Sequence, residues 1–337
     1  MSIRYLHQNI VILSLVLLTP VCDRETERAY SAEELQNMTL SSLEKVNDYP
    51  LYVMTYHGDY GFNGFLETGQ RMALNNHENT EINWGCTCFS GLKNKNSRLL
   101  GRNFDWPNES IPLLLFTDPP EGYASVSVVD LGFFGYSRDN LPDSMKKREN
   151  LLNTPWMPFD GLNEKGVAIG MMAVPHAESP FESSMVTIGE IELIRLVLDH
   201  ADNLDHAISL VQNYNIRIDE PPIHYIITDV SGQSAVVEFY EGEMKIFRNS
   251  RPWQVSTNFI LSEYEDPGQA GCWRYNRTFA TLTGNDGQLT DTTAMEILQN
   301  VSHNNTIWSV VYNMSSGDIS IATGSEFSGT LSYNLYD

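Results

Sequence analysis

The chain has 337 residues, 42% of them hydrophobic, which suits one large globular domain or two modest ones. Its formal net charge of −22 argues against a nucleic-acid partner and against an anionic membrane surface. The eight histidines and four cysteines form no His-x-x-x-His or Cys-x-x-Cys pattern, and no glycine loop has phosphate-binding spacing. We therefore predict no metal site and no cofactor.

Residues 1–22 have the features of a secretory signal. Arg4 supplies a positive start, residues 10–18 are apolar, and Pro20 breaks the run. The run is too short for a comfortable membrane span, although an uncleaved anchor remains open. We expect a secreted or cell-envelope-associated protein. Residues 23–85 follow as a linker or propeptide, with a predicted strand at 52–56, and a structural N-terminal arm is the alternative.

A hairpin is predicted where the sequence carries its most reactive side chain. Residues 83–89 form a strand-like run containing Cys86, residues 93–97 form a polar bend, and residues 98–106 return as a second strand. This pairing brings Arg102 and Asp105 back toward Cys86. A cation beside a thiol favours the reactive thiolate, so an activated nucleophile is one interpretation. A core cysteine with a surface ion pair is the other.

The remaining elements alternate between groups of strands and pairs of helices. Strands are expected at 113–116, 124–131, 167–174, 223–229, 234–240, 243–247, 254–258, 307–314, 318–323 and 329–335. Helices are expected at 188–200, 202–214, 273–282 and 292–301. The order predicts an α+β fold in one domain, with two sheets and helices outside them.

Six segments together resemble the choloylglycine hydrolases and related linear-amide C–N hydrolases, which include bile salt hydrolase, penicillin V acylase and acid-amidase-type enzymes. The segments are 85–87, 101–105, 160–166, 224–238, 256–258 and 273–275. Arg102 and Asp105 follow Cys86 by 16 and 19 residues, which is the family's interval, and counting from Cys88 breaks it. The resemblance implies a four-layer αββα sandwich of the N-terminal-nucleophile (Ntn) type, with residues 86–337 as the catalytic domain.

The resemblance also implies a mechanism. Cys86 is the expected nucleophile once autocatalytic cleavage after Gly85 has freed its amino group, because an α-amine with a pKa near 8 can take the thiol proton. Arg102 is expected to keep the thiol region electropositive, and Asp105 is expected to anchor the amine.

Two further residues complete the implied catalytic set. Asn258 is expected to donate a hydrogen bond to the developing oxyanion, and Arg274 is expected to complete the charge network. The implied reaction is hydrolysis of a small-molecule N-acyl amide through a cysteine thioester, without a cofactor, and a homo-oligomer remains open.

Two positions depart from the family pattern, Ala173 and Cys88. Ala173 occupies a substrate-binding position where the bile-salt enzymes carry asparagine, so only its backbone N–H is available to an oxyanion, and a bile-salt-type substrate is disfavoured. Three alternatives stay open. They are an acyltransferase that uses the same thioester, a catalytically silent Ntn-like binding protein, and a metal or redox protein built on Cys86, Cys88 and Cys272.

Overall fold

The structure is a computed structural model that describes residues 30–69, 85–106, 110–219 and 221–337. The chain divides into two units, Met1–Ser31 and Ala32–Asp337, and all the elements below belong to the second. The predicted signal or anchor lies outside the described residues, as does the 70–84 part of the predicted linker or propeptide. Among the described helices, none is both long enough and apolar enough to cross a bilayer.

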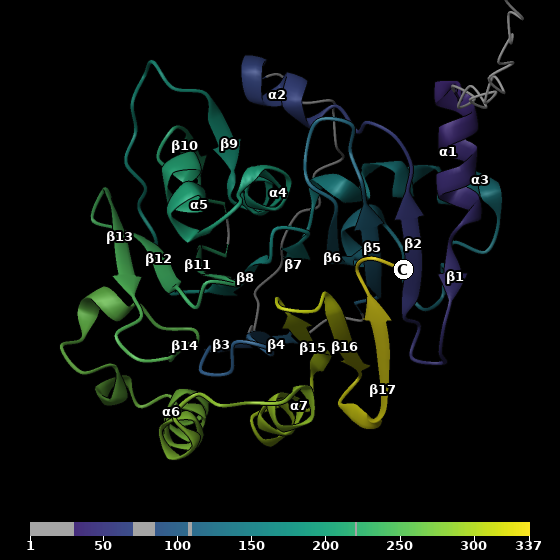
Figure 1. Ribbon diagram of the computed structural model, residues 1–337. Helices are drawn as coiled ribbons and strands as arrows, with labels where there is room; N and C mark the ends of the chain where they lie inside the picture. Colours follow the sequence, from purple (N-terminus) through teal and green to yellow (C-terminus); the bar gives the residue numbers. More distant parts are fainter. Residues whose placement is uncertain (1–29, 70–84, 107–109, 220) are drawn as a thin grey trace, which may run out of the picture. The chain divides into compact units, whose positions relative to one another are not determined.

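Two large sheets form the centre of the 32–337 unit in the part of the chain that is described (Figure 1). The nine-stranded sheet has the order β1 (Glu44–Lys45), β2 (Tyr52–Tyr56), β5 (Pro112–Thr117), β6 (Ser125–Asp130), β7 (Asp160–Asn163), β8 (Val167–Ala173), β11 (Ile223–Asp229), β12 (Ser234–Tyr240) and β13 (Glu243–Arg248). The six-stranded sheet has the order β14 (Trp253–Ser256), β3 (Gly85–Gly91), β4 (Leu99–Asp105), β15 (Thr306–Asn313), β16 (Asp318–Thr323) and β17 (Glu326–Asn334). Neighbouring strands are antiparallel except β2 and β5, and β9 (Thr187–Gly189) and β10 (Asn215–Arg217) form a separate parallel pair.

Helices cover the outer side of each sheet. The α-helices are α1 (Ala32–Ser41), α2 (Phe62–Thr68), α3 (Met145–Arg148), α4 (Glu190–His200), α5 (Leu204–Val211), α6 (Trp273–Asn285) and α7 (Asp291–Asn300). Helix α4 packs on β7 and β8 and α5 on β11, while α6 packs on β3 and β14 and α7 on β4 and β15 (Figure 1). Strand β3 also contacts β8 and β11, so the two sheets face each other. The predicted αββα sandwich is confirmed.

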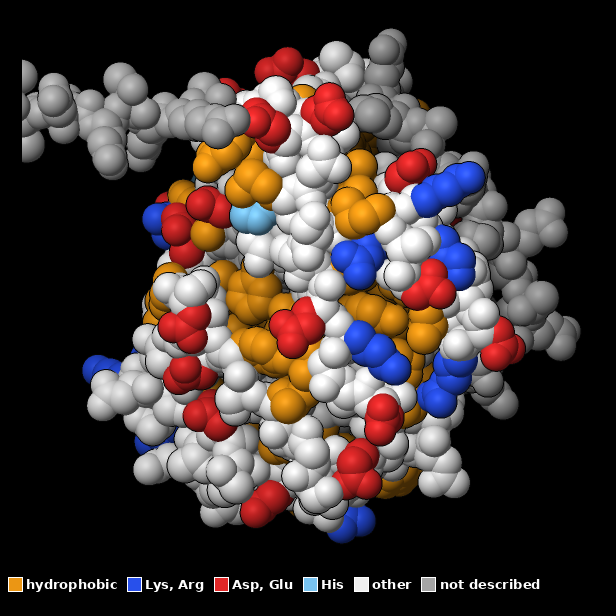
Figure 2. Space-filling view, turned by 90° about the vertical axis from the view of Figure 1, so that its right-hand side faces the viewer, with side chains coloured by type: hydrophobic (Ala, Val, Ile, Leu, Met, Phe, Trp, Pro, Cys, Tyr) orange, Lys and Arg blue, Asp and Glu red, His pale blue; other side chains and the backbone are white. Residues whose placement is uncertain are grey.

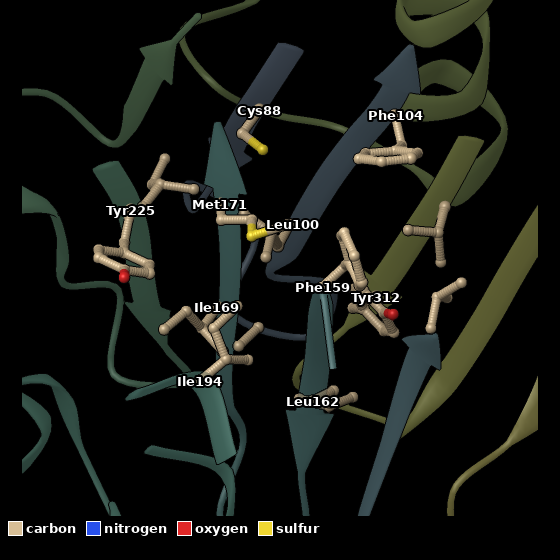
Figure 3. Close-up of a cluster of buried hydrophobic side chains, with 14 of the residues drawn as sticks. Cys88, Leu100, Phe104, Phe159, Leu162, Ile169, Met171, Ile194, Tyr225 and Tyr312 are labelled. Carbon is tan, nitrogen blue, oxygen red and sulfur yellow. The ribbon is translucent and has the colours of Figure 1, made fainter. Parts of the chain in front are cut away.

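The facing strands explain the stability of this arrangement. Every residue of β3, β4, β8 and β11 is buried, because one face of each sheet meets the other sheet and the opposite face meets helices. Figure 3 shows Leu100, Phe159, Met171 and Tyr312 gathered in one apolar cluster between strands. Polar side chains placed in these strands therefore need partners within the protein.

The predicted hairpin is confirmed. Strands β3 and β4 pair antiparallel along their full length, from Gly85 opposite Asp105 to Gly91 opposite Leu99. Strand β4 continues the sheet through β15, so the hairpin lies inside the sheet. Strand β14 pairs with the other side of β3, from Ser256 opposite Cys88 to Trp253 opposite Gly91, so the part of β3 after Cys86 is held on both sides by backbone ladders.

The predicted strand at 52–56 is confirmed as β2, and the segment around it is part of the sandwich. Strand β2 runs parallel to β5, from Tyr52 opposite Leu113 to Tyr56 opposite Thr117. Leu51, Met54 and Phe62 are almost completely buried. The described part of the predicted linker or propeptide, from Ala32 on, is therefore folded with the rest of the unit, and its removal stays untested.

A buried polar contact also ties this segment to the sandwich. The hydroxyl of Tyr60 lies 2.7 Å from both carboxylate oxygens of Asp199, and Arg195 Nη1 donates to Asp199 Oδ1 at 3.0 Å. The Arg195 guanidinium also stacks over the Tyr60 ring. Loss of Tyr60 would leave a buried ion pair short of one donor, which is costly in an apolar interior.

One face of the molecule carries charge of both signs. Figure 2 shows acidic side chains scattered over this face, basic side chains mostly on the right-hand side of the view with acidic ones among them, and apolar atoms exposed across its middle.

We predict that residues 32–69 stay bound when the chain is cut between 70 and 84. The test replaces residues 74–79 with a protease recognition site in a Cys86→Ala chain, so that only the added protease cuts. The two pieces are expected to coelute in size-exclusion chromatography and to separate in denaturant, because each large apolar side chain buried at the contact contributes about 1.5–3 kcal/mol. Separate elution without denaturant would refute this.

Candidate active site

The hairpin places a thiol next to a guanidinium. Cys88 lies opposite Arg102 in the β3–β4 register, so Cys86, two residues away, shares the same face. The distance from Cys86 Sγ to Arg102 Nη2 is 3.9 Å. Cys86 is 3% exposed and Arg102 is fully buried. The thiol and its cation are therefore both shielded from water.

A carboxylate on the other sheet balances the charge of Arg102. Arg102 Nη1 forms an ion pair with Asp160 Oδ2 and donates to the Phe159 carbonyl at 3.0 Å. Asp160 also accepts hydrogen bonds from Trp308 Nε1, at 3.0 Å, and from the Tyr312 hydroxyl. Burial alone would lower the pKa of Arg102, but Asp160 and the nearby thiols raise it, so Arg102 remains charged.

Burial has the opposite effect on the thiol of Cys86, the candidate nucleophile. It raises the pKa of the Cys86 thiol above its usual range, and the Arg102 cation only partly offsets this. The thiol of the uncut chain is therefore mostly neutral near neutral pH, and Arg102 alone does not provide a thiolate. A base is needed to take the proton.

The other cysteines are placed less favourably for chemistry. Cys88 is fully buried, and burial raises the pKa of its thiol strongly. The thiol of Cys272 accepts a hydrogen bond from Thr257 Oγ1 at 3.3 Å. Cys86, Cys88 and Cys272 are all free, and the described residues contain no group of histidine, cysteine and carboxylate side chains that could hold a metal ion. The geometry thus gives the metal or redox alternative no support.

Side chains from far along the chain hold the backbone of Cys86. Its N–H donates to Asn258 Oδ1 at 2.6 Å, and Arg274 Nη2 donates to the same oxygen at 2.8 Å. Arg274 Nη1 donates to the Cys86 carbonyl oxygen and, at 3.1 Å, to Thr87 Oγ1. Asn258 and Arg274 therefore fix the peptide groups on both sides of the Cys86 Cα.

The amide of Asn258 also reaches Ala173. Its Nδ2 donates to the Ala173 carbonyl at 2.8 Å, which ties the end of β8 to the segment after β14. An amide nitrogen carries two hydrogens, so one stays available for another acceptor. Ala173 thus borders the site through its backbone, and its predicted substrate-binding role stays a prediction.

Asp105 lies beside the bond predicted to be cut. Its Oδ1 accepts a hydrogen bond from Thr306, and its Oδ2 lies 3.9 Å from Arg274 Nη1. Oδ2 has no hydrogen-bond partner among the described residues, and burial raises the pKa of this carboxyl. A Cβ added at Gly85 would lie 3.0 Å from Oδ2, which is tighter than ordinary contact. Glycine is therefore the residue that fits most easily before Cys86.

The structure thus brings the residues predicted from the sequence together around Cys86. Arg102, Asn258 and Arg274 contact Cys86, Asp105 lies near Arg274, and Ala173 is joined through Asn258. Sequence reasoning missed three residues that bind the predicted site residues, namely Thr87, Asp160 and Thr306. Asp160 opens the segment 160–166, which was noticed only as a family-like turn, whereas Thr306 had no local signal.

The chain matches known hydrolases in sequence. A family model described as linear amide C-N hydrolases, choloylglycine hydrolase family, matches residues 86–262, slightly more than half of the chain. Penicillin V acylase from Pectobacterium atrosepticum is 23% identical over 192 residues, which are 52% of this chain and 50% of that protein. The chain therefore spans about half the length of this curated relative.

Solved structures agree in fold. A mutant of the conjugated bile acid hydrolase from Clostridium perfringens superposes with a TM-score of 0.52 at 16% identity, covering 74% of this chain and 92% of that one. A second variant of that protein gives a TM-score of 0.50 at 14% identity, covering 74% and 93%. The fold is that of the Ntn hydrolases. The chain belongs to the choloylglycine hydrolase family of linear amide C–N hydrolases.

We predict that Asp160→Asn strongly destabilises the protein. Removing one partner of a buried ion pair leaves an uncompensated charge and costs about 3–5 kcal/mol of the free energy of unfolding. Chemical denaturation is the measurement. The matched control is Asp286→Asn, which breaks the exposed 2.8 Å pair with Lys93 and is expected to cost about 0–1 kcal/mol. Equal losses in the two variants would contradict the assignment.

Proposed function

We propose that this protein hydrolyses a small-molecule linear N-acyl amide through a thioester on Cys86, after its own Gly85–Cys86 bond has been cut. The proposal rests on the contacts that Cys86 makes. The thiol of Cys86 adjoins Arg102, while its N–H, part of the bond to be cut, donates to Asn258. Family membership supplies the reaction class, amide hydrolysis.

The first cut follows from the neighbours of this bond. The Cys86 sulfur attacks the Gly85 carbonyl carbon, the C–N bond breaks, and the thiol proton passes to the nitrogen that becomes the α-amine. Water then hydrolyses the Gly85 thioester, which releases a Gly85 carboxylate and restores the thiol. Asn258 Oδ1 orients the nitrogen throughout, since it already accepts the N–H of the intact bond.

The freed amine then serves as the base for substrate. An α-amine has a pKa near 8, so part of it is neutral near neutral pH and able to accept the thiol proton. Removal of Gly85 opens the space beside Asp105 Oδ2, which lacks a hydrogen-bond partner among the described residues and is suited to accept from the new ammonium group. The predicted role of Asp105 as amine anchor is retained on this ground.

Substrate turnover repeats the same chemistry. The thiolate attacks the acyl carbonyl, the amine product leaves with a proton, and water hydrolyses the thioester. The second hydrogen of Asn258 Nδ2 is available to the oxyanion, a contact worth about 2.7–4 kcal/mol in the transition state of comparable sites. Arg274 holds Asn258 and the Cys86 carbonyl in place.

Other parts of the function stay proposals. We retain the secreted or cell-envelope location, which rests on residues 1–22, and the homo-oligomer left open by the sequence.

The matched relatives are named for penicillin V and conjugated bile acids, and both kinds of molecule are amides that can be screened. Ala173 disfavours the bile-salt type. An acyltransferase remains the second candidate, because an amine in place of water would accept the same thioester.

Cys86→Ala is expected to abolish chain cleavage. We predict that purified wild-type protein yields a chain starting at Cys86, because the thiol is the attacking group, and that the variant remains uncut. Intact mass and N-terminal sequencing distinguish the two, and Cys88→Ala serves as the matched control that should still be cut. A folded wild-type chain that keeps its Gly85–Cys86 bond would overturn the nucleophile assignment and favour the binding-protein alternative.

The rate of this cleavage should rise with pH. Burial raises the pKa of Cys86, so the thiol is mostly protonated at neutral pH and each increase in pH enlarges the reactive thiolate fraction. We expect the rate constant, followed by intact mass after refolding, to climb between about pH 6 and pH 9. A rate that does not change over this range would show that thiol deprotonation is not limiting.

A further inference from the structure

A second buried polar pair lies beside the segment that carries Asn258. His224 in β11 and Glu238 in β12 are 1% and 2% exposed, and they lie one position beyond the paired residues Tyr225 and Val237. His224 Nδ1 lies 2.9 Å from Glu238 Oε1, and His224 Nε2 lies 2.8 Å from the Thr257 carbonyl oxygen. The mechanism above uses neither residue.

The hydrogen bonds of this pair satisfy its buried polar atoms. A carbonyl oxygen only accepts, so His224 Nε2 is the donor to Thr257. Glu238 Oε1 accepts from the Leu261 N–H at 2.7 Å, and Oε2 accepts from the Ser262 N–H at 3.1 Å and its hydroxyl at 2.9 Å. Both carboxylate oxygens thus face donors, which favours ionised Glu238. Glu238 Oε1 also lies 2.9 Å from His224 Nδ1, so both nitrogens of the ring are held by hydrogen-bond partners.

The pair holds both ends of one short segment. His224 binds the carbonyl of the residue before Asn258, and Glu238 binds two backbone N–H groups three and four residues after it. Since β11 and β12 belong to the nine-stranded sheet and β14 to the six-stranded sheet, these bonds also link the two sheets next to the site. Between the two ends lies the side chain that accepts the Cys86 N–H.

We infer that His224 and Glu238 are positioning residues, which hold the 257–262 segment so that Asn258 Oδ1 meets the nitrogen of Cys86. This inference rests on the proposed function. Neither residue touches the reacting atoms. A displacement of about 1 Å at a site of this kind can reduce a rate by about 100-fold, so a loosened segment has a measurable effect on chain cleavage.

The first test measures the rate of Gly85–Cys86 cleavage in the full chain by intact mass after refolding. Glu238→Gln keeps the size and shape of the side chain, but its amide NH2 group would face the donors that Glu238 now accepts from. We expect cleavage about 100-fold slower. His224→Leu should be similarly slow, whereas His224→Gln, which keeps a donor for the Thr257 carbonyl, should recover part of the rate.

The matched control is Asp229→Asn. Asp229 lies at the opposite end of β11, is equally buried, and accepts backbone N–H groups of Leu204 and Ser231. The Asp229→Asn variant should lower the midpoint of thermal unfolding about as much as Glu238→Gln does, but it should leave the cleavage rate unchanged. If Glu238→Gln is cut at the wild-type rate, or if both variants slow cleavage in proportion to lost stability, the inference is overturned.

A second test does not depend on cleavage. In a Cys86→Ala chain labelled with ¹⁵N-alanine, hydrogen exchange of the backbone N–H at position 86 reports its bond to Asn258. Adding Glu238→Gln should accelerate this exchange by at least about tenfold, and adding Asp229→Asn should not. A wild-type chain that is never cut would overturn the proposed function alone. Unchanged exchange in the Glu238→Gln chain would overturn the positioning role.

Discussion

The ion pair between Arg102 and Asp160 is the interaction on which the site depends. Arg102 lies in the six-stranded sheet and Asp160 in the nine-stranded sheet, so the pair crosses the interior of the sandwich. A buried guanidinium needs a charged partner and further hydrogen bonds, and Asp160 is itself held by Trp308 and Tyr312. The pair thereby fixes a cation beside Cys86 in surroundings that would otherwise exclude charge.

Two more polar links cross the sandwich near the same end of the hairpin. Asn258 reaches the Ala173 carbonyl, and His224 with Glu238 holds the segment in which Asn258 lies. All of these groups are largely withdrawn from water, which strengthens each hydrogen bond and makes any unpaired group costly. The same burial keeps the Cys86 thiol protonated, which explains why a mechanism built on this site requires a nearby base.

The N-terminal segment packs across the chain boundary that the sequence predicts before Cys86. The motif at 85–87 predicts a boundary before Cys86, yet β2 adds a strand to the sheet and Tyr60 donates to the buried Asp199. The folded unit therefore begins at Ala32. A strand inside a sheet keeps its place through backbone hydrogen bonds and apolar contacts, whether or not the chain that follows it is continuous.

Local sequence determined the elements and much of the site. The strand–bend–strand pattern at 83–106 predicted the hairpin, and family-like spacing selected Cys86, Arg102 and Asp105, because both depend on residues close together in the chain. Only the tertiary structure showed that Asp160 balances Arg102, that Thr306 holds Asp105, and that Asn258 accepts the Cys86 N–H. These contacts join residues 58 to 201 positions apart in the chain, and no local pattern specifies which buried groups will meet.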